Sequence, residues 1–348
     1  MPRLRQPPEW VPHTAVWSAW PRVPEYWEGA MEGARRELAA FFRAITDPDP
    51  ATGKPRGEAV KILVWGDEAR RSAEEALTAD GIEHIEIPYG DVWFRDIAPV
   101  FVRDEALRAT AVCFRYNGWG GKYLMEFDDA VAAKIAAHLR TPRRDEDWVF
   151  EGGSLDVDGE GTALTTCQCL LNPNRNPGLD EDAVARRLRD SIGVEKLIWL
   201  DEGLANDHTD GHIDNIARFL APGKVACMRP SGTDDPNAAV LLRIEESLRA
   251  ATDAAGRPLE VVTVPSPGFV PDAEGKPAPA SHMNFYIANT RVLVPLYGTS
   301  YDEAALDALS PHFPGREIIG LRANHILVGG GSFHCVTREQ PAYRRRGP

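Results

Sequence analysis

Segments with the patterns of strands and helices alternate along most of the chain, and this alternation limits the fold more than any other feature. Apolar runs at residues 60–65 and 82–88 predict strands, and residues 68–78 between them predict a helix. Further helices are predicted at residues 30–45, 128–139, 181–192, 238–251 and 303–309, and further strands at residues 197–200, 225–228, 259–264, 284–287, 292–295 and 317–320. Four tryptophans among prolines in residues 7–28 predict an irregular segment laid over a core or a pocket mouth. The alternation predicts an α/β protein, and because no long linker divides the 348 residues we expect a single domain over residues 1–348.

The composition is that of an ordinary soluble globular protein, with 43% hydrophobic and 26% charged residues. The formal net charge of −13 argues against a nucleic-acid partner and favours a site for small cations. The basic run at residues 344–346 is too short to change that expectation. The first residues lack the apolar core of a signal peptide, and no apolar run approaches the roughly 20 residues of a membrane helix. Five cysteines without the spacing of a disulfide framework suit a reducing compartment, so we expect a cytoplasmic protein that does not bind membranes.

Cys335 follows a run of three glycines at residues 329–331. Residues 326–328 before the run resemble a strand, and residues 332–337 after it are expected to be extended. Glycines let a ligand approach the main chain closely. A thiol in this place could attack an electrophile, provided that a base or a positive charge lowers its pKa. The alternative is a structural cysteine that packs as a small apolar residue.

Carboxylates follow two predicted strands. Asp91 and Asp96 flank aromatic residues, where a carboxylate could receive a cation or could pair with Arg95 to hold the loop. Glu151 comes directly after an apolar segment that ends at Phe150, so its pKa depends on the partners that surround it. The alternative for Glu151 is a solvated acid in a glycine turn.

The densest polar cluster places His208, Asp210, His212 and Asp214 at alternate positions. If this segment is extended, all four side chains share one face. Imidazole and carboxylate donors on one face could bind a divalent metal, or one histidine could serve as a general acid/base beside a substrate-binding carboxylate. A third alternative is a purely structural turn or helix cap. Residues 167–169, Cys-Gln-Cys, are expected to form a strand with two small side chains on one face, because no second such pair completes a zinc site.

Together these stretches resemble the agmatine deiminase family, part of the guanidine-modifying superfamily that includes arginine deiminases, peptidylarginine deiminases and amidinotransferases. The resemblance spans nearly the whole chain. The motifs that carry it are Glu-Trp-Val-Pro-His at residues 9–13, Trp-Ser-Ala-Trp-Pro at 17–21, Trp-Phe-Arg-Asp at 93–96, Asn-Gly-Trp-Gly-Gly-Lys at 117–122, Glu-Gly-Gly at 151–153, Leu-Asn-Pro-Asn-Arg-Asn-Pro at 171–177, Thr-Asp-Gly-His-Ile-Asp at 209–214, Asn-Phe-Tyr-Ile-Ala-Asn at 284–289 and Gly-Gly-Gly-Ser-Phe-His-Cys-Val-Thr at 329–337. It implies a five-bladed α/β propeller of ββαβ-like units around a pseudo-fivefold axis, with the active site at the centre.

Carried over residue by residue, the resemblance implies that Cys335 is the nucleophile and His212 the general acid/base, while Glu151 orients His212 or binds substrate nitrogens. Asp96 and Asp214 would grip the planar guanidinium through charge-assisted hydrogen bonds. The implied reaction is hydrolysis of agmatine to N-carbamoylputrescine and ammonia through a covalent thiouronium, with no metal or other cofactor. The bound cation and a protonated His212 would favour the thiolate of Cys335.

Substrate choice depends on the groups that meet the far end of the molecule. Trp93 and Trp119 would line the alkyl chain or face the terminal ammonium through a cation–π contact, with core packing as the alternative. The chain departs from the usual family pattern at four positions. Family members usually have Gly at the position of Ala98, Glu at Cys167, Tyr at His282 and Ile at Phe333. Of these, His282 and Cys167 could lie near the substrate tail.

Other functions remain open at this point. A related enzyme could deiminate free arginine or peptidylarginine, or transfer the amidino group to an amine. A metal-dependent hydrolase built on His208, Asp210, His212 and Asp214 and a guanidinium-binding protein without activity belong to different classes. Analogy with relatives suggests a homodimer.

Overall fold

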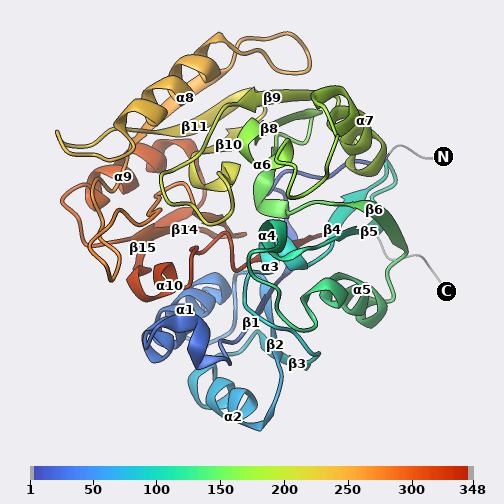
Figure 1. The fold of residues 1–348 in the computed structure, drawn as a ribbon. Helices are drawn as coiled ribbons and strands as arrows, with labels where there is room; N and C mark the ends of the chain where they lie inside the picture. Colours follow the sequence, from blue (N-terminus) through green and yellow to red (C-terminus); the bar gives the residue numbers. More distant parts are fainter. Residues whose placement is uncertain (1–3, 344–348) are drawn as a thin grey trace.

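The computed structural model describes residues 4–343, and the strands in this part of the chain form five small sheets around a common centre (Figure 1). In four of the sheets, three consecutive strands pair so that the first two are antiparallel and the last two are parallel. A crossover connection containing a helix joins the two parallel strands, as parallel pairing requires. This arrangement confirms the α/β propeller of ββαβ-like units.

The strands of these four units are β4 (Val100–Arg103), β5 (Ala109–Arg115) and β6 (Arg143–Val149); β7 (Asp156–Val157), β8 (Thr162–Thr166) and β9 (Lys196–Leu200); β10 (Ala217–Ala221), β11 (Lys224–Arg229) and β12 (Glu260–Pro265); and β13 (Tyr286–Ile287), β14 (Arg291–Leu296) and β15 (Glu317–Arg322). The outer helices are α1 (Met31–Thr46), α2 (Asp67–Ala76), α5 (Asp128–Leu139), α7 (Glu181–Ile192), α8 (Ala238–Ala250) and α9 (Asp302–Leu309). Short helical segments are α3 (Phe94–Ile97), α4 (Gly118–Gly121), α6 (Cys167–Leu170), α10 (Asn324–Val328), η1 (Pro24–Trp27), η2 (Gly152–Ser154), η3 (Ile213–Asn215) and η4 (Ser310–His312).

The fifth sheet joins segments from the two ends of the chain. Its order is β16 (Arg338–Pro341), β1 (His13–Ala19), β2 (Ala59–Val64) and β3 (Ile82–Glu86). Strand β16 runs antiparallel to β1, with Trp17 opposite Arg338, whereas β1, β2 and β3 are parallel. The last described strand therefore closes the ring against the first.

A buried carboxylate ties several units together near the centre. One oxygen of Glu9 lies 3.3 Å from Arg95, 3.0 Å from Arg218 and 2.8 Å from the ring of His334. Its other oxygen accepts a hydrogen bond from the backbone N–H of Ile287 at 2.7 Å. Glu9 thus provides a shared counter-charge for two buried guanidinium groups that come from different units.

Most predicted elements lie within a few residues of their expected bounds, and the helices at residues 128–139 and 181–192 have the predicted bounds. The prediction of an irregular segment at residues 7–28 was wrong, because this segment contains β1 and η1. Strand β1 has neighbours on both sides and is almost wholly buried, so it lacks the alternation that marks a half-exposed strand. The tryptophans there are mainly core residues, since Trp17, Trp20 and Trp27 are fully buried.

The two predictions around the glycine run were also wrong. Residues 326–328 belong to helix α10, and residues 332–337 form turns before β16 begins. The side chain of Glu37 on α1 accepts hydrogen bonds from the backbone N–H groups of His325 and Ile326 at 2.9 and 3.0 Å. These bonds satisfy donors that the start of a helix leaves free, and the contact joins residues 288 positions apart.

One polar segment expected to form a strand does not, and a second segment, for which an extended form was one alternative, is not extended. Residues 167–169 lie in α6, where the Thr166 side chain caps the helix by accepting from the backbone N–H of Cys169 at 3.2 Å. The segment from His208 to Asp214 forms turns that lead into η3. There the side chain of Asp207 accepts from the backbone N–H of Thr209 at 2.9 Å, a local bond that favours a turn over a strand.

Among residues 4–343, no helix is both long enough and apolar enough to cross a membrane. Residues 1–3 and the basic run at 344–346 lie outside the described part of the chain.

Candidate active site

Cys335 is a buried thiol held from two sides by one amide group. The Nδ2 group of Asn284 donates to Sγ of Cys335 at 3.0 Å, and Oδ1 of Asn284 accepts from the backbone N–H of Cys335 at 3.2 Å. Burial and the negative charges of Asp214 and Asp96 raise the pKa of the Cys335 thiol well above its ordinary value. Without a bound cation, the thiol is therefore protonated at neutral pH.

The glycine run lets a tryptophan and the thiol approach the same point. A Cβ atom at Gly331 would lie 2.6 Å from the ring of Trp93 and 3.1 Å from Sγ of Cys335. A Cβ atom at Gly329 would lie 2.9 Å from the same ring. Side chains at these two positions would displace Trp93 or the thiol.

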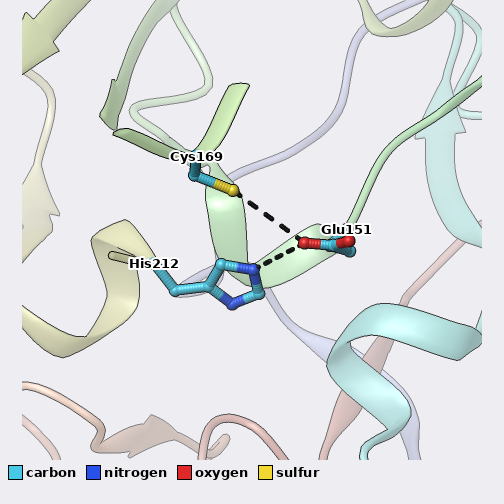
Figure 2. A group of neighbouring side chains, drawn as sticks. All are labelled: Glu151, Cys169 and His212. Atoms are coloured by element: carbon cyan, nitrogen blue, oxygen red, sulfur yellow. Dashed lines mark hydrogen bonds and ion pairs between the residues drawn. The ribbon is translucent and has the colours of Figure 1, made fainter. Parts of the chain in front are cut away.

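His212 and Glu151 form a buried ion pair (Figure 2), with Nε2 of His212 2.9 Å from Oε2 of Glu151. Burial opposes charge on the ring, but Asp96, 3.9 Å from Nδ1, and Glu151 raise the pKa of His212 well above its ordinary value. Burial likewise opposes ionisation of Glu151, but His212 and Arg175 hold the pKa of this carboxyl below its ordinary value. The pair therefore consists of an imidazolium and a carboxylate.

Asp96 and Asp214 approach the histidine from other elements. Asp96 accepts hydrogen bonds from Trp119 Nε1 and from the backbone N–H of Gly153, both at 2.9 Å. Oδ2 of Asp214 lies 2.7 Å from Nδ1 of His334, while its buried Oδ1 has no hydrogen-bond partner. A Cβ atom at Gly153 would lie 2.4 Å from Nδ1 of His212 and 3.1 Å from an oxygen of each aspartate. The imidazole and both carboxylates thus converge on the space that a side chain at position 153 would occupy.

A cavity of about 250 Å³ opens beside these groups and is lined by both Cys335 and Asp96. Trp93 and Trp119 also line it, and their indole N–H groups bond to Asp91 and Asp96, each at 2.9 Å. The other lining residues are Glu25, Tyr26, Glu28, Asp91, Tyr123, Met125, His208, Thr209, Val328, Gly329 and Gly330. None of the described lining residues is lysine or arginine, whereas four are acidic. Such a cavity suits a cation with an apolar stem.

A larger cavity of about 710 Å³ adjoins this one and shares Glu28, His208, Val328 and Gly330 with it. It contains neither Cys335 nor Asp96, both of which line the smaller cavity, so we place the chemistry in the smaller cavity.

The four residues of the metal-site hypothesis have separate partners. Asp210 pairs with Lys122 at 2.8 Å and with Arg175, His212 pairs with Glu151, and Asp214 pairs with His334. His208 lies in the cavity lining, with its ring stacked on Tyr123.

Within the described residues, one group of three donors could approach a metal ion, namely Glu151, Cys169 and His212 (Figure 2). Oε2 of Glu151 already faces Nε2 of His212, and it lies 2.9 Å from the guanidinium of Arg175. A divalent cation at this oxygen would meet that positive charge at close range. These side chains therefore fit a network of ion pairs better than a metal site.

Sequence reasoning assigned no individual role to Asn284, Arg175 or His334, which hold the proposed catalytic groups. All three occur in motifs that carried the family resemblance, and that was the available signal. His282 and Cys167 do not line the cavity. His282 is buried between the backbone oxygen of Pro265 at 2.8 Å and Asp302 at 3.1 Å, and Cys167 begins α6. A position near the substrate tail stays a prediction for both, and the lining of this cavity does not support it.

Comparison with known proteins places these observations in a family. A family profile described as Porphyromonas-type peptidyl-arginine deiminase matches residues 5–341. An agmatine deiminase of Pseudomonas aeruginosa is 37% identical over 369 residues, covering 98% of this chain and 96% of the relative. A putative agmatine deiminase of Legionella pneumophila is also 37% identical and covers 96% and 94% of the two chains. The solved agmatine deiminase of Enterococcus faecalis superposes with a TM-score of 0.89 at 32% identity, covering 97% of this chain and 96% of that one. The chain therefore belongs to the Porphyromonas-type peptidyl-arginine deiminase family, among its agmatine deiminases.

Proposed function

We propose that this protein hydrolyses the guanidinium group of agmatine, giving N-carbamoylputrescine and ammonia. The observation that carries the proposal is the meeting of a thiol, an imidazolium and two carboxylates beside one small acidic cavity. The product is a carbamoylated diamine, so the reaction belongs to the formation of putrescine and other polyamines.

The cavity favours agmatine over arginine. A guanidinium is a planar cation whose paired N–H groups match carboxylates on two sides, and Asp96 and the unpartnered Oδ1 of Asp214 can supply them. Arginine would bring its α-carboxylate into a lining in which none of the described residues is lysine or arginine. Agmatine ends instead in an ammonium, which the acidic residues Glu25, Glu28 and Asp91 tolerate.

The first half-reaction begins when the guanidinium cation of the substrate binds and offsets the negative charges of Asp96 and Asp214. This neutralisation lowers the pKa of Cys335, and the thiol loses its proton to water. The thiolate adds to the guanidinium carbon, forming a C–S bond and a tetrahedral intermediate. His212 gives its proton to the departing nitrogen, the C–N bond breaks, and ammonia leaves a covalent thiouronium on Cys335.

The second half-reaction reverses the role of the histidine. Neutral His212 takes a proton from water as the water oxygen adds to the thiouronium carbon. The C–S bond then breaks, the hydroxyl proton of the intermediate passes to the departing sulfur, N-carbamoylputrescine leaves, and Cys335 returns as the thiol. In both steps Glu151 fixes the orientation of the His212 ring and stabilises its imidazolium form. General acid/base catalysis of this kind increases a reaction rate by roughly 100- to 10,000-fold.

Ammonia release tests the proposal. Purified, metal-stripped protein is offered agmatine, free arginine and an arginine-containing peptide in parallel, with Cys335→Ala as the control. The proposal expects release from agmatine that the variant abolishes. Release of ammonia only from another guanidine would show that agmatine is not the substrate. Activity that needs added divalent metal would overturn the cysteine mechanism.

Three further expectations remain predictions. The five units share one central site, which supports treating residues 1–348 as a single domain. The composition supports a cytoplasmic location, and analogy with relatives supports a homodimer, which sedimentation would test.

A further inference from the structure

Arg175 does not line the cavity, yet its guanidinium lies against the proposed catalytic pair. Its Nε atom lies 3.0 Å from Oε1 of Glu151, and one terminal nitrogen lies 2.9 Å from Oε2. Oε2 is also the oxygen that faces His212. The side chain of Arg175 is 1% exposed, so water screens this interaction little.

The other end of the guanidinium reaches toward the surface. Its second terminal nitrogen bonds to Asp210, and the first also donates to the backbone oxygen of Thr209 at 2.8 Å. Asp210 in turn pairs at 2.8 Å with Lys122, which directly follows α4. The segment at residues 117–123 also carries Trp119, which bonds to Asp96.

These contacts form one continuous series of alternating charges: Lys122, Asp210, Arg175, Glu151 and His212. A carboxylate as buried as Glu151 would accept a proton unless a fixed positive charge opposes it. A protonated Glu151 would stabilise the imidazolium of His212 poorly. The fork of an arginine also fixes the plane of the carboxylate, which a single-point cation does not.

We propose that Arg175 is a positioning residue for the deimination reaction, which holds Glu151 ionised and aimed at His212 and links this pair through Asp210 to the segment that carries Trp119. The inference rests on the proposed function, since it assigns a role within that reaction.

Other titratable groups also face the pair and must be considered in any test by pH. Asp96 lies 3.9 Å from Nδ1 of His212, Cys169 lies 3.9 Å from Oε2 of Glu151, and Asp214 approaches the same side of Gly153. The two aspartates favour protonation of the pair, and Arg175 opposes it. Removing the positive charge therefore lets the pair take up an additional proton at a higher pH.

The experiment compares Arg175→Met and Arg175→Lys with wild type by measuring kcat and kcat/KM for agmatine across the pH range. In Arg175→Met we expect the acidic limb of the profile to move to higher pH by about one to three units. In Arg175→Lys we expect the limb to stay near its wild-type position, because the charge is kept, while kcat falls because the fork is lost. An unchanged limb in Arg175→Met, or equal shifts in both variants, would overturn the inference.

Asp210→Asn provides a test that leaves Arg175 in place. It removes a negative charge beside the guanidinium, so the acidic limb must stay where it is or move to lower pH. A move to higher pH would contradict the proposed role of Arg175 and would indicate general damage to the site. Arg35→Met is the matched control, because Arg35 is similarly buried and pairs with Glu68 on α2, outside the cavity lining. Its profile must keep the wild-type limb.

A readout without turnover separates this inference from the proposed function. Carboxyl NMR of protein labelled with ¹³C at glutamate follows Glu151 directly, with Glu151→Gln to assign the signal. The midpoint for Glu151 must rise in Arg175→Met relative to wild type, and an unchanged midpoint overturns the inference even if agmatine proves not to be the substrate. Failure of wild type to release ammonia, with the NMR shift present, would overturn the proposed function alone.

Discussion

The side chain of Asn284 contacts Cys335 twice, donating to Sγ at 3.0 Å and accepting from its backbone N–H at 3.2 Å. The first contact stabilises a thiolate more than a thiol, since hydrogen bonds to charged groups are the stronger ones. The second fixes the backbone from which the thiol projects.

Replacement of Asn284 by alanine should therefore make Cys335, the proposed nucleophile, less reactive. We expect the loss of about 1.5–3 kcal/mol of thiolate stabilisation, or roughly a 10- to 100-fold lower kcat/KM. Steady-state kinetics and the pH dependence of iodoacetamide inactivation measure both effects. Asn289→Ala is the control, because Asn289 bonds to the backbone of His13 and not to Cys335. Equal losses in the two variants would show that stability, not the thiolate, is responsible.

Removal of a neighbouring negative charge should make the free thiol more reactive. Asp214 and Asp96 raise the pKa of Cys335, so Asp214→Asn or Asp96→Asn lowers this pKa and increases the thiolate fraction at a given pH. Iodoacetamide at pH 8 should then inactivate both variants faster than wild type, although their turnover of agmatine falls. Asp147→Asn, at an exposed position, should react at the wild-type rate. Slower alkylation of both site variants would contradict the electrostatic account.

A single methyl group at Gly153 should disrupt the site. In Gly153→Ala the new Cβ would lie 2.4 Å from Nδ1 of His212, so the ring or the backbone must shift. We expect kcat/KM to fall by at least 100-fold, because displacements of about 1 Å have effects of this size. Gly53→Ala is the opposite case, since Gly53 has φ +72° and nothing within 4 Å of its Cβ position. It should cost about 1 kcal/mol of stability and leave activity unchanged.

The central carboxylate should matter mainly for stability. In Glu9→Gln, the buried guanidinium groups of Arg95 and Arg218 lose a shared counter-charge, and we expect the free energy of unfolding to fall by about 3 kcal/mol. Urea denaturation measures this difference. Glu245→Gln breaks an i,i+4 pair with the exposed Arg249 and should cost less than about 0.5 kcal/mol. Similar costs for the two variants would disprove the central role of Glu9.

Sequence patterns predicted the elements that show one buried and one exposed face. Helix α7 is an example, because Asp180 caps its start, Val184 and Leu188 are buried, and Gly193 ends it in the left-handed region. The ring itself came from resemblance to a family, since its units share a topology that local periodicity does not reveal.

Segments whose structure depends on distant contacts could not be predicted locally. The apolar residues of α10 resembled a strand, but Glu37 provides their helix cap from the opposite end of the chain. Arg175 and His212 are separated from Glu151 by 24 and 61 positions, and Asn284 is separated from Cys335 by 51. Only the fold brings these residues together.

Pairing of β16 with β1 has a consequence for biosynthesis. Cys335 lies three positions before β16, so the proposed nucleophile and the strand that closes the ring emerge from the ribosome together, long after β1. Until then, β1 presents an open edge to other chains, and the partly made protein has no complete active site. A nascent chain therefore cannot consume substrate, and a chaperone that shields β1 during translation should improve the yield of folded enzyme.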